Sequence, residues 1–290
     1  WVARWSSQFP VFTLKTGLYG FLGAALIVAA IYFGRAKFAA VLLILIISTS
    51  WLQRFPAGDW QIANCDVGQG DAMVINLRHH RAIVIDVGPD PQLIDRCLHQ
   101  LGITDIPLLI LTHIHADHVG GLQGAKKNRR IGTTWFGNIY AGTHARIDTI
   151  NIDVKWPRRN GFDGNPNNSS IAATFTSPDF TLFAAGDIEP PVQAQLLSQI
   201  GKVDIYKVAH HGSRYQDRDL MRELSPAVAV ISVGTGNSYG HPAPSTISAL
   251  TLLHAKVLRT DVDGAVAIRA QRHRLSIQRS KRWLRIFYWS

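Results

Sequence analysis

The chain has 290 residues, of which 47% are hydrophobic and 17% are charged, and its formal net charge is +10. It has no internal repeat or low-complexity segment, and its two cysteines, Cys65 and Cys97, exclude a disulfide framework, so we expect both to be small buried apolar residues. The basic excess favours polyanions or anionic lipid surfaces as partners, with a solvated basic face as the alternative.

Residues 1–56 differ in character from the rest of the chain. Two nearly uncharged runs, 16–33 and 38–52, are separated by a short basic turn. A bilayer core needs about 20 helical residues, or about 17 at the lower limit. The second run is shorter, but Lys37 and Trp51 at its ends suit the membrane interface. We therefore expect a transmembrane helical hairpin, with a pair of buried core helices as the alternative.

Two further features bear on the membrane segment. The chain has no initiator methionine, which suggests a fragment of a larger, multi-pass membrane protein. Cations flank the open end of the hairpin and occupy its turn in nearly equal number. The positive-inside rule therefore leaves open on which side of the membrane the following domain lies.

After residue 56 the sequence alternates between strands and helices. One helix is predicted over Pro91–Leu101, with Asp90 as N-cap and Gly102 after its end, and a second over Thr246–His254, capped by Ser245. The predicted strands are Trp60–Val67, Ala72–Leu77, Ala82–Val87, Leu108–Leu111, Ser170–Thr176, Phe180–Ala185, Ile205–Ala209, Val228–Val233, Lys256–Arg259 and Gly264–Arg269. This order indicates an α/β fold with helix-covered sheets, without distinguishing a two-sheet sandwich from one open sheet.

The string His-Ile-His-Ala-Asp-His at residues 113–118 follows the apolar run PLLILT and precedes Val-Gly-Gly. Neutral imidazoles and a carboxylate are the ligands of zinc and similar divalent ions. His113 and His115 can converge on one ion, while Asp117 and His118 point to a second position. The spacing therefore predicts a two-metal site.

Further ligands are expected at the ends of other strands. Asp86 closes the run RAIVID, Asp187 follows LFAAG, and His210 and His211 follow YKVA. Adjacent residues rarely face the same way at a strand end, so we expect one histidine of the pair to be a ligand and favour His211. A carboxylate can bind two metals at once, so Asp187 is predicted to bridge both ions.

These positions follow the order of the metallo-β-lactamase fold superfamily. Within it, the strings DVGQGDA (66–72), NNSS (167–170), AAGDIE (184–189), AHHGS (209–213) and YGHP (239–242) resemble the ComEC family. That family is the bacterial competence channel for DNA internalisation, and the resemblance covers roughly residues 60–270. It implies a four-layer αββα domain over residues 57–270, preceded by the last transmembrane helices of a multi-pass inner-membrane protein. It also implies competence proteins, the remainder of the channel and membrane lipid as partners.

One position departs from the general superfamily pattern. Many members have another histidine between the cluster and the bridging aspartate, where this chain has NNSS. ComEC-like sequences share this difference, so Asn168 or a water is expected to complete the first ion's surroundings. An oxygen-richer site would accept manganese as well as zinc. Asp86 is expected to orient a ligand histidine through its second ring nitrogen.

Several other side chains are candidates for catalysis or substrate binding. Asp117, Asp187 and His241 are the expected catalytic residues, His241 as a phosphate contact or proton donor, with a structural capping role as its alternative. Lys207, Ser213 and Arg214 are possible phosphate contacts near the histidine pair. The loop 68–71 is expected to be a tight turn, with a weaker indication that its amides approach the site.

Residues 271–290 are predicted to be a basic aromatic tail. Seven cations occur between Arg269 and Arg285 without an acidic residue, and aromatic residues lie among and after them. This pattern suits single-stranded nucleic acid and a membrane surface equally, with a disordered solvated tail as the alternative. The expected function is a membrane-anchored, metal-dependent nuclease that degrades the DNA strand that is not imported. The alternatives are a non-catalytic module that guides single-stranded DNA, and a phosphodiesterase with a substrate other than DNA.

Overall fold

The computed structural model describes residues 55–160 and 164–280, together with the isolated residues Ala25, Val28, Tyr32 and Ala40. The chain divides into two compact units, Trp1–Arg54 and Phe55–Ser290, and only the second is described in detail. Among the described residues, no helix has both the length and the apolar character that crossing a bilayer requires. The predicted hairpin falls almost entirely outside these residues.

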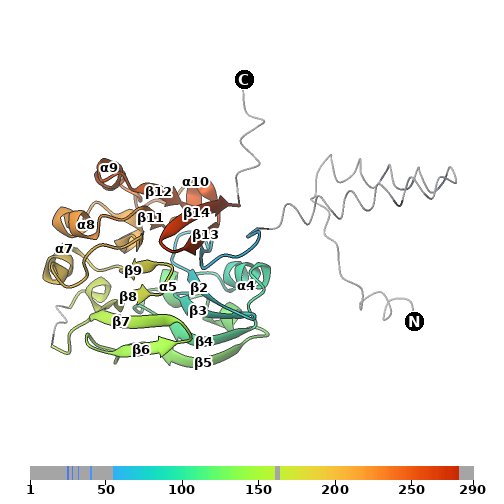
Figure 1. Cartoon of the computed structure of the whole chain (residues 1–290), viewed down its shortest axis with the longest axis horizontal. Helices are drawn as coiled ribbons and strands as arrows, with labels where there is room; N and C mark the ends of the chain where they lie inside the picture. Colours follow the sequence, from blue (N-terminus) through green and yellow to red (C-terminus); the bar gives the residue numbers. More distant parts are fainter. Residues whose placement is uncertain are drawn as a thin grey trace, which may run out of the picture. The chain divides into compact units, whose positions relative to one another are not determined.

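The second unit contains two sheets of seven strands each (Figure 1). The first sheet has the order β14-β13-β1-β2-β3-β4-β5 and the second has the order β12-β11-β10-β9-β8-β7-β6. The strands of the first sheet are β1 Ile62–Asn64, β2 Met73–Arg78, β3 Arg81–Ile85, β4 Asp105–Ile110, β5 Arg130–Trp135, β13 Val266–Gln271 and β14 Arg274–Arg279. Those of the second sheet are β6 His144–Ile147, β7 Ile150–Trp156, β8 Ala172–Thr176, β9 Thr181–Ala184, β10 Ile205–Lys207, β11 Val228–Ile231 and β12 Lys256–Arg259.

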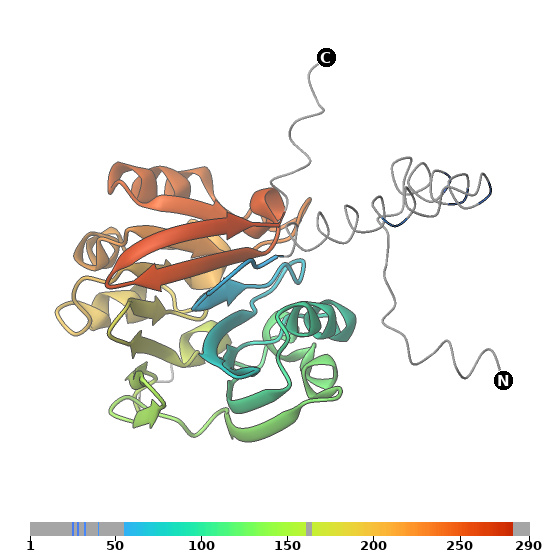
Figure 2. The same cartoon turned by 45° about the vertical axis from the view of Figure 1, so that its right-hand side comes forward.

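Helices cover the outer face of each sheet, and Figure 2 shows the two groups on opposite sides of the domain. The helices are α4 Pro91–Gln100, α5 Ala116–Val119, α6 Leu122–Lys126, α7 Pro190–Gln193, α8 Arg218–Leu224, α9 Pro244–Leu252 and α10 Thr260–Asp263. Three short 3₁₀ segments, Pro166–Ser169, Ala194–Leu196 and Ala209–Gly212, lie in the connections.

The core forms three apolar layers because side chains alternate along each strand. In β2, Met73 and Ile75 face the space between the sheets, where Phe175 and Leu182 of the second sheet meet them. Val74 points the other way, into the layer under α4 and α6. A third layer lies between the second sheet and helices α8 and α9. This arrangement is the expected αββα sandwich, with both sheets buried on both faces.

Helix α4 begins and ends as its sequence predicts. The Asp90 carboxylate accepts hydrogen bonds from the amides of Gln92 and Leu93 at 2.6 and 3.3 Å, and Gly102 after the helix has a φ of +71°. Helix α9 differs from the prediction. It starts at Pro244 after Ala243, which provides no side-chain cap, so Ser245 is already inside the first turn.

Four strands were not predicted: β5, β6, β7 and β14. β5, β6 and β14 lie at sheet edges, where partly exposed polar positions hide the apolar signal. β14 lies within the segment 271–290 that was expected to be a tail, and it pairs with β13 from Val266↔Arg279 to Gln271↔Arg274. The first sheet therefore extends beyond residue 270, to Arg279.

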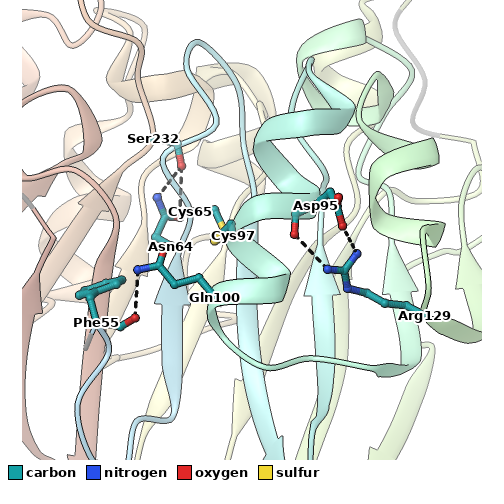
Figure 3. Close-up of a disulfide and its surroundings, with 8 residues drawn as sticks. All are labelled: Phe55, Asn64, Cys65, Asp95, Cys97, Gln100, Arg129 and Ser232. Carbon is teal, nitrogen blue, oxygen red and sulfur yellow. Dashed lines mark hydrogen bonds and ion pairs between the residues drawn. A yellow bond between two sulfur atoms is a disulfide. The ribbon is translucent and has the colours of Figure 1, made fainter. Parts of the chain in front are cut away.

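The expectation that the cysteines are unlinked is wrong. Cys65, directly after β1, and Cys97, on α4, form a disulfide (Figure 3). Nothing in a separation of 32 residues indicates this pairing, which arises when α4 packs on the first sheet with the two Cα atoms 6.0 Å apart. The same helix is held by Asp95, whose carboxylate and carbonyl both accept hydrogen bonds from Arg129.

Candidate metal centre

The predicted ligands meet at one edge of the sandwich. Strands β3 and β4 run parallel in the first sheet, and β9, β10 and β11 run parallel in the second. Their carboxyl ends therefore point to the same edge, and the segments that follow them carry the candidate side chains. Residues separated by up to 125 positions in the sequence, from Asp86 to His211, are brought together there.

Four side chains form a compact group that suits one divalent ion. One ligand atom from each of Asp117, His118, Asp187 and His211 lies within 4.8 Å of the others. The Nε2 atom of His211 is 3.0 Å from Asp117 Oδ2 and 3.5 Å from Asp187 Oδ2. Three of the four residues are buried, and Asp117 is half-buried.

His113 and His115 lie beside this group and define a second, sparser position. His113 Nε2 is 3.0 Å from His115 Nδ1 and 4.0 Å from Asp187 Oδ2. Burial, together with the neighbouring His118, lowers the pKa of His113 to about 3, so its ring is neutral and can donate a lone pair. Within the described residues, Asp187 is the carboxylate that lies closest to both histidine sets.

Asp187 is central to the arrangement. Its Oδ2 atom is 3.3 Å from His118 Nε2 and 4.0 Å from His210 Nε2, in addition to the distances to His113 and His211. Burial alone would raise the pKa of Asp187, but His118 and His211 hold it well below its ordinary value. The carboxylate is therefore ionised between the two sets of imidazoles.

The donor atoms fit a metal ion on a direct structural criterion. His118 Nε2 and Asp187 Oδ1 are buried polar atoms without a hydrogen-bond partner. Such atoms are costly unless something satisfies them. Burial would also lower the pKa of His211, yet the carboxylates of Asp187 and Asp71 raise it to about 10. The buried carboxylates thus demand positive charge, which a divalent cation supplies with the same nitrogen and oxygen donors.

Asp86 lies behind His118, one of the predicted ligands. Its Oδ2 atom is 2.8 Å from His118 Nδ1 and accepts a hydrogen bond from Thr112 Oγ1 at the same distance. The amide of Thr112 donates to Asp86 Oδ1 at 2.7 Å. Burial would lower the pKa of His118, but Asp187 and Asp86 raise it well above its ordinary value. Asp86 therefore fixes the ring so that Nε2 faces the cluster.

Lys207 was expected to be a phosphate contact, and the structure places it in the interior. It is 2% exposed, and its Nζ donates to Asp71 Oδ2 at 2.7 Å. Asp71 Oδ1 also lies 3.2 Å from His211 Nδ1. The same nitrogen is 3.1 Å from the carbonyl oxygen of Ser232. Burial alone would raise the pKa of Asp71, but Lys207 and His211 hold it well below its ordinary value. Lys207 thus neutralises the carboxylate that orients His211.

The loop 68–71 approaches the site more closely than a simple turn. The amide of Asp71 donates to the Asp117 carbonyl at 3.0 Å. At Gly70, φ is +154° and an added Cβ would lie 2.3 Å from the Asp117 carbonyl oxygen. Only glycine permits this contact, which brings the loop against the segment that carries Asp117 and His118. Sequence reasoning missed the role of Asp71, although its position in the GQGD string was the available signal.

The NNSS segment supports the site from the opposite side. Asn168 Oδ1 accepts a hydrogen bond from the Glu189 amide at 2.9 Å, so it holds the loop that carries Asp187. Ser170 Oγ accepts from the Asp187 amide at 3.0 Å and lies 3.2 Å from His113 Nδ1. Ser170, which was not singled out from the sequence, leaves His113 Nε2 directed at the cluster.

The remaining candidates separate into rim and interior residues. His210 is less buried than His211, and its ring centroid is 5.3 Å from that of His241. Burial and the adjacent His210 lower the pKa of His241 to about 4. Arg214 is exposed beside this pair. Ser213 was expected to contact phosphate but is 1% exposed, and its Oγ accepts a hydrogen bond from the Tyr215 amide, so it stabilises the turn.

Comparison with known proteins agrees with the fold and the motif order. Residues 65–144 match the family model of the metallo-beta-lactamase superfamily. The chain is 24% identical to ComE operon protein 3 of Bacillus subtilis over 259 residues, covering 73% of this chain and 33% of that protein. It is 27% identical to recombination protein 2 of Haemophilus influenzae over 241 residues, covering 77% of this chain and 30% of that protein.

A third relative is competence protein ComA of Neisseria gonorrhoeae, with 25% identity over 255 residues, 81% of this chain and 35% of that protein. The chain thus spans about a third of the length of each of these relatives. The sandwich and the superfamily match indicate a metallo-β-lactamase fold for the described unit, and the chain is similar to competence proteins of the ComEC kind.

Proposed function

We propose that this domain is a metal-dependent phosphodiesterase that hydrolyses DNA during uptake and acts on the strand that is not imported. The observation that carries the proposal is the buried Asp187 carboxylate, whose Oδ2 lies between His113 on one side and His118 and His211 on the other. A carboxylate in this position suits two ions that share one ligand. Two such ions, when bound, activate a water and polarise the phosphoryl group.

The protein groups divide between the two positions. His113 and His115, with Asp187, would hold one ion, and Asp117, His118 and His211, with Asp187, the other. The mixture of imidazole and carboxylate donors suits zinc and manganese. Asp86 and the Asp71–Lys207 pair keep His118 and His211 in the required orientation.

Two rim residues are the proposed contacts of the substrate. His241 has a buried Nδ1 without a hydrogen-bond partner, and Arg214 is exposed nearby. We assign His241 to the substrate phosphate or the leaving group, and Arg214 to the flanking phosphate. The closeness of the His241 ring to His210, and of Arg214 to His241, supports this assignment.

The relatives and the net charge of the chain favour DNA as the substrate. The relatives include a competence protein, and the chain carries a net charge of +10. On the β13–β14 hairpin, Arg269, Arg272 and Arg274 line a cavity of about 630 Å³, and the hairpin turn lies at the edge of the sandwich opposite the metal centre, beside Asp179 and Asp204. These cations add to the basic surface that attracts phosphates, but they do not border the proposed catalytic centre. The proposed partners are therefore single-stranded DNA, the remainder of the channel, other competence proteins and the lipid of the inner membrane.

The disulfide supports a location of this domain on the outer side of the inner membrane. Bonds such as Cys65–Cys97 persist in oxidising compartments and are rare in the cytoplasm. A domain on the outer side of the inner membrane would meet DNA before import. That location suits an enzyme that removes the strand left outside.

Hydrolysis of 5′-labelled single-stranded DNA by the full chain, with added manganese or zinc, tests the proposal. We expect cleavage that is abolished by chelator and by Asp187→Ala and His115→Ala. Asp219→Ala and His144→Ala, on the exposed surface away from the cluster, are matched controls and should retain activity. Binding of DNA without cleavage under either metal would replace this proposal with a strand-guiding module. Cleavage of a choline phosphodiester but not of DNA would refute the assignment of the substrate.

A further inference from the structure

A cavity of about 270 Å³ opens beside the sparser metal position. His113 and Asn168 form the wall that it shares with the metal centre, and Phe136, Tyr140, Arg158 and Arg159 are on the other walls. Its volume is slightly below the range of about 300–1,000 Å³ typical of pockets for drug-sized ligands. The space is therefore suited to one small unit of a substrate rather than to an extended segment.

Two loops from different sheets build the outer walls. Phe136 and Tyr140 follow β5, at the edge of the first sheet, while Arg158 and Arg159 follow β7 in the second. The amide of Ala141 donates to the Pro157 carbonyl at 2.7 Å, which ties the loops together. The guanidinium of Arg159 lies 5.0 Å from the centre of the Tyr140 ring. The walls are thus joined by direct contacts.

The cavity is cationic and aromatic. None of the described residues that line it is acidic. In residues 55–160 and 164–280, Arg158 and Arg159 approach aromatic rings and have no carboxylate within ion-pair distance. Two large apolar side chains that line the cavity, Phe136 and Ile114, are 46% and 66% exposed, so the cavity carries apolar surface beside its cations.

We propose that this cavity binds one nucleotide of a single strand next to the phosphate that is cleaved. The base would stack on Tyr140 or Phe136, and its phosphate would pair with Arg158 or Arg159. Aromatic rings stack on any base and guanidinium groups pair with phosphate, so such a site selects nucleic acid without reading sequence. His113 links the cavity to the metal centre. This inference rests on the proposed function and narrows its substrate to nucleotides.

Two chromogenic substrates with the same leaving group test it. Thymidine 5′-(p-nitrophenyl phosphate) carries a nucleoside, and methyl p-nitrophenyl phosphate reaches only the metal centre. For the full chain with manganese, we expect kcat/KM to be at least about tenfold higher for the thymidine ester. The double variant Tyr140→Ala/Arg159→Ala should lose most of this preference, while its kcat/KM for the methyl ester stays within about twofold.

The control variant is Arg218→Ala, which removes an exposed arginine on α8, outside the cavity, and should keep the preference. Thermal unfolding of each variant shows whether it is folded. An unchanged preference in the double variant, or a wild-type chain that prefers a choline ester, would overturn the inference.

If wild type cleaves neither ester nor labelled DNA, the proposed function fails and the cavity is judged by binding. Fluorescence anisotropy of a labelled ten-nucleotide oligo(dT) then decides. Weakening of about tenfold in the double variant, but not in Arg218→Ala, would support the nucleotide site. Equal affinity in all three proteins would refute it.

Discussion

Replacing Lys207 with methionine separates the two interpretations of this residue, a phosphate contact and a buried structural cation. Lys207 and Asp71 are 2% and 3% exposed, and their Nζ and Oδ2 atoms are 2.7 Å apart. Removing one member of a buried ion pair leaves the other charge uncompensated and costs about 3–5 kcal/mol. Asp71 keeps its contact with His211 Nδ1 at 3.2 Å, so we expect a loss near the lower limit, about 3 kcal/mol.

Urea unfolding of the chain, with chelator present, measures this loss. The buried residues Trp60 and Trp156 provide the fluorescence signal. Lys202→Met is the matched control, because Lys202 is exposed just before β10 and its loss should change the unfolding free energy by less than about 0.5 kcal/mol. The double variant Asp71→Asn/Lys207→Met removes both charges and should recover part of the loss.

Two results would refute the assignment of Lys207 as a buried structural cation. If Lys207→Met leaves the unfolding free energy unchanged and raises KM for DNA, Lys207 faces substrate and not Asp71. If both the single and the double variant lose the same free energy, the cost comes from the lysine stem and not from the unpaired carboxylate.

Three further changes have defined outcomes. Cys97→Ser opens a loop closed over 32 residues and should lower the unfolding free energy by about 3–4 kcal/mol in urea, and wild type in reductant should lose as much. Asp86→Asn should weaken zinc binding about 10- to 100-fold in competition with a chromogenic chelator, because the carboxylate that orients His118 is lost; unchanged affinity would contradict that role. Ser170→Ala leaves the buried Asp187 amide without its acceptor and should cost about 1–3 kcal/mol in thermal or urea unfolding, whereas a neutral effect would show that another group replaces it.

The sequence was most informative where ligand chemistry and strand ends coincide. The HIHADH string follows β4, and Asp86, Asp187 and His211 follow β3, β9 and β10, so parallel strands bring them to one edge. Each apolar run predicted a strand, and the polar residue after each run was predicted to lie near the site. His211, the histidine that we favoured as a ligand, is more buried than His210. The rule that adjacent residues face different ways could not say which of the two rings turns inward.

Sequence patterns along one segment could not predict which side chains pair with residues far away in the sequence. The Lys207–Asp71 pair joins residues 136 positions apart, and a lysine at a strand end is just as compatible with a phosphate contact until the opposite loop is known. The Cys65–Cys97 bond requires that α4 pack directly above β1. The edge strands β5, β6 and β14 lacked an apolar signal because solvent covers part of them.

The two proposed metal positions differ in how firmly the protein holds the side chains that would form them. His118 lies against the buried carboxylate of Asp86, and His211 lies against that of Asp71 and the Ser232 carbonyl, whereas His113 lies against hydroxyl groups, among them Ser170. The weaker position is also the one that adjoins the 270 Å³ cavity, because His113 lines both. An ion with few protein donors keeps coordination sites open for other ligands. Because NNSS stands where a further histidine was expected, the sparser of the two proposed metal positions has few protein donors and adjoins the cavity that we propose for a nucleotide, and this supports the proposed function.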